Sequence, residues 1–116
     1  MIHEEEIEHQ WLRVAHYFKT LTGKKPDLNG VLFLIGIQEL GKGIREFSKE
    51  QKQDLMHIGT CAVLTKSGYY TPEGRDEDGW PHWKLSKKMP MLTLEEQEQF
   101  LKIHVIEYMR DEIGNV

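Results

Sequence analysis

The sequence has little of what stabilises secreted or membrane proteins. Cys61 is the only cysteine among 116 residues, so neither an intrachain disulfide nor a cysteine metal cluster can form. A single cysteine is typical of a reducing compartment. The longest apolar run, Val31 to Ile37, is far shorter than the roughly 20 residues that span a bilayer. The acidic start, Glu4 to Glu6, is unlike the basic start of a secretion signal. We therefore expect a cytoplasmic protein with no membrane partner.

The sequence also lacks an excess of positive charge and the common catalytic motifs. Fifteen basic and 19 acidic residues give a formal net charge of -4. Nucleic-acid binders usually have the opposite balance, because contacts with phosphates dominate their affinity. No Gly-x-Ser-x-Gly elbow, phosphate-binding loop or Gly-x-Gly-x-x-Gly motif occurs. The composition disfavours a nucleic-acid partner and indicates a non-enzymatic protein.

What the sequence does contain is apolar side chains at helical spacing. The pattern predicts helices over 1–22, 27–40, 48–66 and 93–112. Ser48 with Gln51, and Thr93 with a glutamate three residues later, match the capping box that begins a helix. In the first helix the expected apolar stripe is Ile7, Trp11, Val14, Ala15 and Phe18. In the last helix it is Leu94, Leu101, Val105, Tyr108 and Met109.

The second predicted helix contains a continuous apolar run, Val31 to Ile37, which also fits a buried strand. Leu28 and Leu40 extend its apolar character over more than three turns, which is longer than a usual strand. Asp27 is a suitable N-cap and Gly41 a suitable residue just past the C-terminus. We therefore predict a central helix that is apolar on all sides.

Residues 67–91 break the helical pattern with glycine, proline and a charged tip. Tyr69-Tyr70-Thr71 and Trp83-Lys84-Leu85 can pair as a short hairpin. The two tryptophans and two tyrosines argue against simple disorder. The predicted fold is an all-α, four-helix bundle-like single domain over 1–116, with an excursion over 67–91 that can contain a β-hairpin.

The leading functional hypothesis is a protein-interaction module. Trp80 and Trp83 are large amphipathic side chains of the kind enriched in interfaces, with His82 between them. The alternative is that both tryptophans fold back onto the helices. Phe100, Ile103 and Ile106 lie outside the main stripe of the last helix, which offers a second apolar face. The expected partner is a protein, including a second copy of this chain in a homodimer, and no cofactor is required.

An alternative hypothesis is a metal-dependent helical-bundle enzyme or sensor. Asp54 and His57, and likewise His104 and Glu107, are three residues apart and share a helix face. With Glu39 they are candidate ligands of a divalent metal ion, since facing helices hold di-iron sites in this way. The usual Glu-x-x-His motif is absent, however, and edge residues in local hydrogen bonds explain the same pattern.

A third hypothesis is a winged-helix DNA-binding regulator, because a helix, a possible hairpin and a terminal helix follow in that order. Lys49 and Lys52 lie near the start of the would-be recognition helix. The would-be wing is strongly acidic, which opposes phosphate binding.

Cys61 and His57, which lies one turn earlier, could form a nucleophile and base. A lone cysteine in an apolar helix, however, usually serves only to pack the core.

Overall fold

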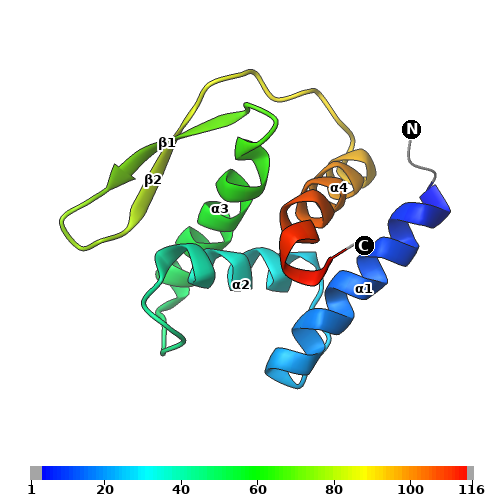
Figure 1. The fold of residues 1–116 in the computed structure, drawn as a ribbon. Coiled ribbons are helices and arrows are strands. Elements are labelled where there is room, and N and C mark those ends of the chain that lie inside the picture. The colour runs from blue at the N-terminus through cyan, green and yellow to red at the C-terminus, as the bar shows by residue number, and fades with distance from the viewer. Residues whose placement is uncertain (1–3, 115–116) are drawn as a thin grey trace. The chain divides into compact units, whose positions relative to one another are not determined.

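A computed structural model describes residues 4–114, which contain four helices and one antiparallel β-hairpin (Figure 1). The elements are α1 (Glu4–Thr22), α2 (Leu28–Leu40), α3 (Lys49–Thr65), β1 (Tyr70–Arg75), β2 (Pro81–Leu85) and α4 (Leu94–Ile113). The predicted helical fold with a hairpin is confirmed, and the apolar run after Pro26 is a helix. The start of the first predicted helix, residues 1–3, lies outside the described residues. Within 4–114, no helix has the length and apolar character needed to cross a bilayer.

The chain forms two compact units, and the boundary between them falls inside α2. One unit comprises the residues up to Val31 together with those from Leu92 onwards, and the other comprises Leu32–Met91. Each unit is described by itself below. The prediction of a single domain stays a prediction.

In the first unit, α1 and α4 pack against each other. The predicted α1 stripe is confirmed, because all five of its apolar residues are buried. Lys102 of α4 links the two helices: its Nζ lies 3.6 Å from Glu8 Oε1 and 5.3 Å from the centroid of the Trp11 ring. The ammonium therefore combines an ion pair with a cation–π contact.

The N-termini of three helices are capped by local hydrogen bonds that the sequence predicts. The Ser48 Oγ accepts the Gln51 amide at 3.1 Å, and the Gln51 Oε1 accepts the Ser48 amide at 2.9 Å. Thr93 and Glu96 repeat this capping box at the start of α4. Asp27 accepts the Gly30 amide at 2.8 Å, which makes it the N-cap of α2. These bonds satisfy amides that have no partner within the helix.

In the second unit, α2 crosses α3 at Gly36 and Gly59, where the two backbones touch (Figure 1). A Cβ on Gly36 would overlap the carbonyl oxygen of Leu55 and lie 2.7 Å from its carbonyl carbon. A Cβ on Gly59 would overlap the Leu32 oxygen and lie 2.9 Å from its carbonyl carbon. Both glycines are therefore required for this close crossing, because each lies directly against the main chain of the other helix.

The core of the second unit lies beside this crossing. Ile37, Leu40, Leu55 and Ile58 are buried together, and partly buried aromatic side chains pack around them. Phe33 and Phe47 meet edge to face, with centroids 6.2 Å apart. Two tryptophans of the hairpin belong to the same cluster. The hairpin is thereby attached to the helices by apolar packing.

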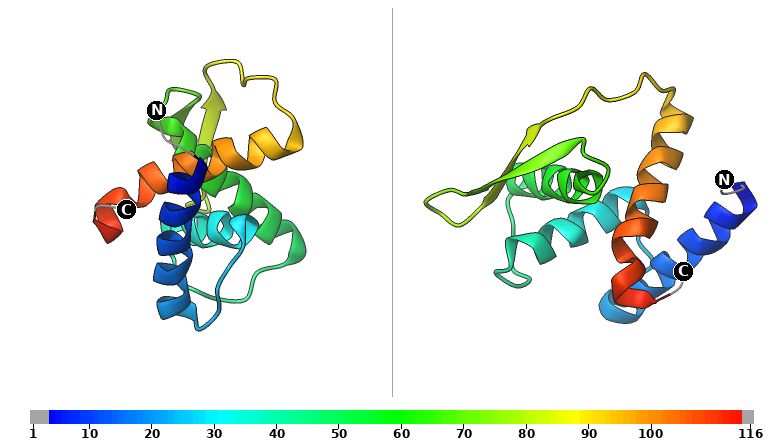
Figure 2. Two further views of the ribbon diagram at one scale, coloured as in Figure 1. Left: turned by 90° about the vertical axis from the view of Figure 1, so that its right-hand side faces the viewer. Right: turned by 45° about the horizontal axis from the view of Figure 1, so that its top comes forward.

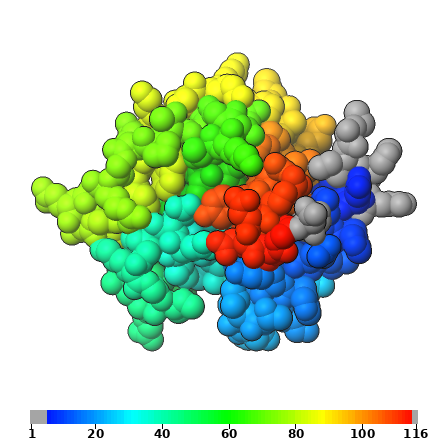
Figure 3. All heavy atoms as spheres, in the orientation of Figure 1, coloured from blue at the N-terminus to red at the C-terminus, as the bar shows by residue number. Residues whose placement is uncertain are grey.

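The hairpin runs alongside α3, as both Figure 1 and the right-hand view of Figure 2 show. The predicted hairpin is confirmed: Tyr70 pairs with Leu85 and Thr71 with Lys84, whereas Tyr69 lies outside β1. An irregularity between Pro72 and Gly74 shifts the register towards the tip. The outward edge of β1 lies on the molecular surface (Figure 3). The inner side of the hairpin faces α3, and this arrangement forms the candidate site.

Candidate functional site: the cleft between α3 and the hairpin

A cleft of about 400 Å³ lies between α3 and the β-hairpin. This volume is in the range of small-molecule and side-chain binding sites. Its lining combines carboxylates, imidazoles and indoles, and none of the lining residues is a lysine or an arginine. The lining residues are Gln51, Asp54, His57, Ile58, Cys61, Asp76, Asp78, Trp80, Pro81, His82 and Trp83.

Arg75 fixes the hairpin to the C-terminus of α2. Its guanidinium donates hydrogen bonds to the carbonyl oxygens of Glu39 at 2.7 Å and Leu40 at 3.0 Å. A third bond, 2.7 Å long, reaches the Gly79 carbonyl in the hairpin turn. The last carbonyls of a helix have no partner within it and carry partial negative charge, so a guanidinium is well suited to them. The cleft therefore has a rigid outer wall.

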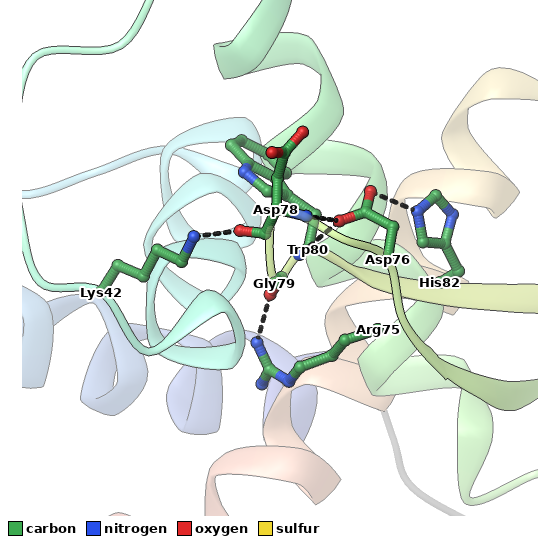
Figure 4. Close-up of polar contacts among 7 residues, drawn as sticks. All are labelled: Lys42, Arg75, Asp76, Asp78, Gly79, Trp80 and His82. Atoms are coloured by element: carbon green, nitrogen blue, oxygen red, sulfur yellow. Dashed lines mark hydrogen bonds and ion pairs between the residues drawn. The ribbon is translucent and has the colours of Figure 1, made fainter.

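Lys42, in the loop after α2, adds a second link to the turn. Its Nζ donates a hydrogen bond to the carbonyl oxygen of Asp78 (Figure 4). The Lys42 stem also comes close to Gly79, whose φ of +83° is accessible to glycine at little cost. Lys42 and Arg75 are thus both committed to main-chain carbonyls of this region.

Asp76 organises the turn from within. Its Oδ1 accepts the amides of Asp78 at 3.0 Å and Trp80 at 2.9 Å, and its Oδ2 accepts the His82 Nε2–H at 2.9 Å (Figure 4). The hydrogen bond from His82 is the largest cause of a lowered pKa of the Asp76 carboxyl, followed by the Trp80 amide. The Asp76 carboxylate in the acidic tip is therefore occupied by hydrogen bonds that shape the turn.

Trp80 and Trp83 form the apolar part of the cleft. Both are partly buried and pack on the core residues between α2 and α3. Both tryptophans therefore pack against the helices, as the alternative reading of the sequence expects, and both also line the cleft. The Trp83 Nε1–H is buried and has no acceptor among the described residues.

Cys61 is the only cysteine in the sequence, and it lines the cleft. Its residue is 1% exposed, and burial raises the pKa of the thiol to about 11. The His57 Nε2 lies 3.5 Å from its Sγ, which is the distance of a weak hydrogen bond. Burial of Tyr70 raises the pKa of its own hydroxyl, and the neighbouring Cys61 is the second cause. The Tyr70 ring meets His57 edge to face. A protonated, buried thiol fits packing, as the sequence favours.

The five candidate metal ligands are not gathered into one donor set. Asp54 and His57 line the cleft, whereas Glu39 lies on α2 and contributes its main-chain carbonyl to Arg75. His104 and Glu107 belong to the other unit. Among residues 4–114, no group of three or more His, Cys, Asp or Glu side chains is placed to hold a metal ion. The described residues therefore contain no complete set of ligands for the metal hypothesis.

The local partners of the α4 candidates fit structural roles. The His104 Nδ1 contacts the Phe100 carbonyl at 2.7 Å, and the two rings lie 4.4 Å apart. The Glu107 Oε2 pairs with Arg110 at 2.8 Å.

The two apolar faces predicted for α4 are only partly correct. Phe100 and Ile103 are partly exposed, but Ile106, expected outside the main stripe, is 2% exposed. Leu94, expected within that stripe, is 85% exposed, because it is the first residue of the helix. The second face is therefore narrower than the sequence indicates.

The order of elements from α3 to α4 matches the winged-helix hypothesis, but the charges oppose it. Arg75, the one basic residue of the tip, is bound to carbonyl groups. The exposed residues around it include Glu73, Asp76, Glu77 and Asp78. Carboxylates at this density repel a phosphate backbone.

No family model, curated protein or solved structure matches this chain. Function must therefore be argued from the cleft itself. Sequence reasoning identified Trp80, His82 and Trp83, together with Asp54 and His57, but it did not bring these two groups into one site. Sequence reasoning did not place Asp78 in this site, because the α3 residues that line the cleft with it are distant in the sequence.

Proposed function

We propose that this protein is a non-enzymatic protein-interaction module that binds its partner in the cleft between α3 and the β-hairpin. The observation that carries the proposal is the pairing of two partly exposed indoles with a firmly anchored hairpin. Tryptophans in a preformed pocket are the usual anchors of protein interfaces. A rigid wall reduces the conformational entropy lost on binding.

The same cleft is poorly suited to catalysis. The lining includes no hydroxyl side chain, and its one thiol is buried and protonated. The pair formed by Asp76 and His82 resembles an acid–base dyad in distance, but its carboxylate also holds the turn together. Because the Asp76 carboxylate is already committed to the hydrogen bonds of the turn, the arrangement supports recognition over acid–base catalysis.

The test uses peptide ligands selected from a random library on the purified protein. Asp54 lies on the α3 wall of the cleft, and its neighbour Gln53 is exposed but does not line the cleft. The variant Asp54→Trp fills the cleft, and Gln53→Trp adds the same side chain outside it. We expect selected peptides to bind Asp54→Trp at least about tenfold more weakly and Gln53→Trp almost unchanged.

Circular dichroism and thermal melting of both variants show whether the fold is kept. Equal affinity for the two variants would place the binding surface elsewhere and refute the proposal.

Self-association through α4 is a separate part of the proposal. Phe100 and Ile103 remain partly exposed and support it, whereas the burial of Ile106 removes some of the apolar area that the sequence indicates. Sedimentation equilibrium at increasing protein concentration tests it. A dimer that Ile103→Glu dissociates would support the homodimer, and a strict monomer would exclude it.

A further inference from the structure

The carboxylates of the cleft differ in whether they already have partners. Asp76 accepts three hydrogen bonds from the turn and His82. The side chains of Asp54 and Asp78 have no hydrogen bond or ion pair with any residue in the described part of the chain. Two exposed carboxylates at the cleft are thus available to a cationic group of a ligand.

The basic side chains closest to the turn form no ion pair with the carboxylates of the cleft. Lys42 and Arg75 donate to main-chain carbonyl oxygens instead. Figure 4 shows the Asp78 carboxylate and the Trp80 ring extending to one side of the turn, with Arg75 approaching from the other. The two cations offset part of the negative charge of this region, but among the described residues the Asp78 carboxylate has no hydrogen-bond donor.

The two indoles make this negative site suitable for an organic cation. The face of tryptophan attracts a cation more strongly than that of the other aromatic side chains. Trp80 and Trp83 also offer apolar area to an alkyl chain that leads to the charged group. Charge and aromatic surface together match a long side chain that ends in a guanidinium or an ammonium.

We infer that the cleft binds an arginine or lysine side chain of a basic segment in the partner protein. The inference rests on the proposed function and adds the chemistry of the partner. Glu73 and Glu77 are exposed on the same hairpin, outside the residues that line the cleft. A segment with several basic residues fits this wider negative surface better than a small isolated amine does.

The experiment measures fluorescence anisotropy of a labelled peptide that carries several arginines, at low and at moderate ionic strength. The same peptide with citrulline in place of arginine keeps the shape and removes the charge. We expect the arginine peptide to bind, the citrulline peptide to bind at least about tenfold more weakly, and added salt to weaken the arginine complex.

A pair of charge-matched variants tests the location. Asp54→Asn with Asp78→Asn removes two charges from the cleft, whereas Glu6→Gln with Asp111→Asn removes two from exposed positions on α1 and α4. We expect the first pair to weaken the arginine peptide about tenfold and the second pair less than about twofold. Trp80→Phe, which keeps an aromatic ring, should lose part of the affinity.

Four results would overturn the inference. They are no binding of the arginine peptide at low salt, equal binding of the citrulline peptide, equal loss in both charge-matched pairs, and displacement of the arginine peptide by free arginine as effectively as by the unlabelled peptide. The first three exclude charge recognition in the cleft, and the fourth indicates a small-amine site. If library selection still yields cleft-dependent peptides without basic residues, the proposed function stands and only this inference fails.

Discussion

Replacing Gly36 by alanine should destabilise the protein, although alanine is the better helix former. Helix propensity alone would stabilise the variant by about 1 kcal/mol. The new Cβ, however, would overlap the Leu55 carbonyl oxygen, which is main chain and cannot rotate away. Overpacking in a core costs about 1–3 kcal/mol, and a clash with backbone belongs at the upper end. The expected net loss is therefore about 2 kcal/mol.

Urea denaturation followed by far-ultraviolet circular dichroism measures this loss. For a chain of this size, about 2 kcal/mol lowers the melting temperature by about 8 °C. Gln53→Ala, at an exposed position of α3, is the control and should change stability by less than about 0.5 kcal/mol. A Gly36→Ala variant that is as stable as the parent, or more stable, would show that the helices do not meet as described.

The same crossing predicts how two substitutions combine. Gly59→Ala should cost a similar amount, because its Cβ would overlap the Leu32 carbonyl oxygen. Once one alanine has separated the helices, the second meets less resistance, so the double variant with Gly36→Ala should lose less than the sum. Distant sites normally add within about 0.5 kcal/mol. Strict additivity of two large losses would contradict a shared contact.

Three further predictions concern the hairpin and the thiol. Arg75→Met should lower the free energy of unfolding by about 1–3 kcal/mol in urea denaturation, because carbonyls at the end of α2 lose their donor; a neutral effect would contradict this anchoring. Because the folded protein lowers the pKa of Asp76, the ionised carboxylate stabilises the fold at pH values above its ordinary pKa of 3.8. Asp76→Asn should therefore be less stable than the parent at neutral pH, and the difference in free energy of unfolding should shrink as the pH falls below 3.8. Cys61 should resist thiol reagents until the protein unfolds, and stability should fall as the pH rises from 9.0 towards about 11, because only the unfolded thiol ionises there. The variant Cys61→Ala should reduce this alkaline slope and leave the part that the raised pKa of Tyr70 causes.

Local features of the fold could be predicted because they depend on neighbours in sequence. The capping boxes at Ser48 and Thr93 need only the residue three positions later, and both are present. The α1 stripe follows from a regular spacing that places its members on one side. The hairpin follows from two short segments joined by a turn, whereas the register that pairs Tyr70 with Leu85 comes from the structure.

Features that depend on distant residues could not be predicted in this way. Gly36 and Gly59 each look like a weak point in a helix, and only their meeting explains them. The role of Arg75 is also invisible in sequence, since two of its three acceptors are carbonyls of residues more than 30 positions away. Leu94 shows the opposite error, in which a position on the apolar stripe has nothing to pack against.

The sequence by itself determined the helices, their ends and the pairing of the hairpin, because backbone hydrogen bonds and apolar periodicity act over a few residues. Only the tertiary structure decided that the hairpin folds along α3, and thus that Asp54 and Asp78 share a cleft with Trp80. Packing of the indoles on the core and the bonds of Arg75 set that position. Such contacts join groups far apart in the chain, where local patterns carry no information about which surfaces will meet.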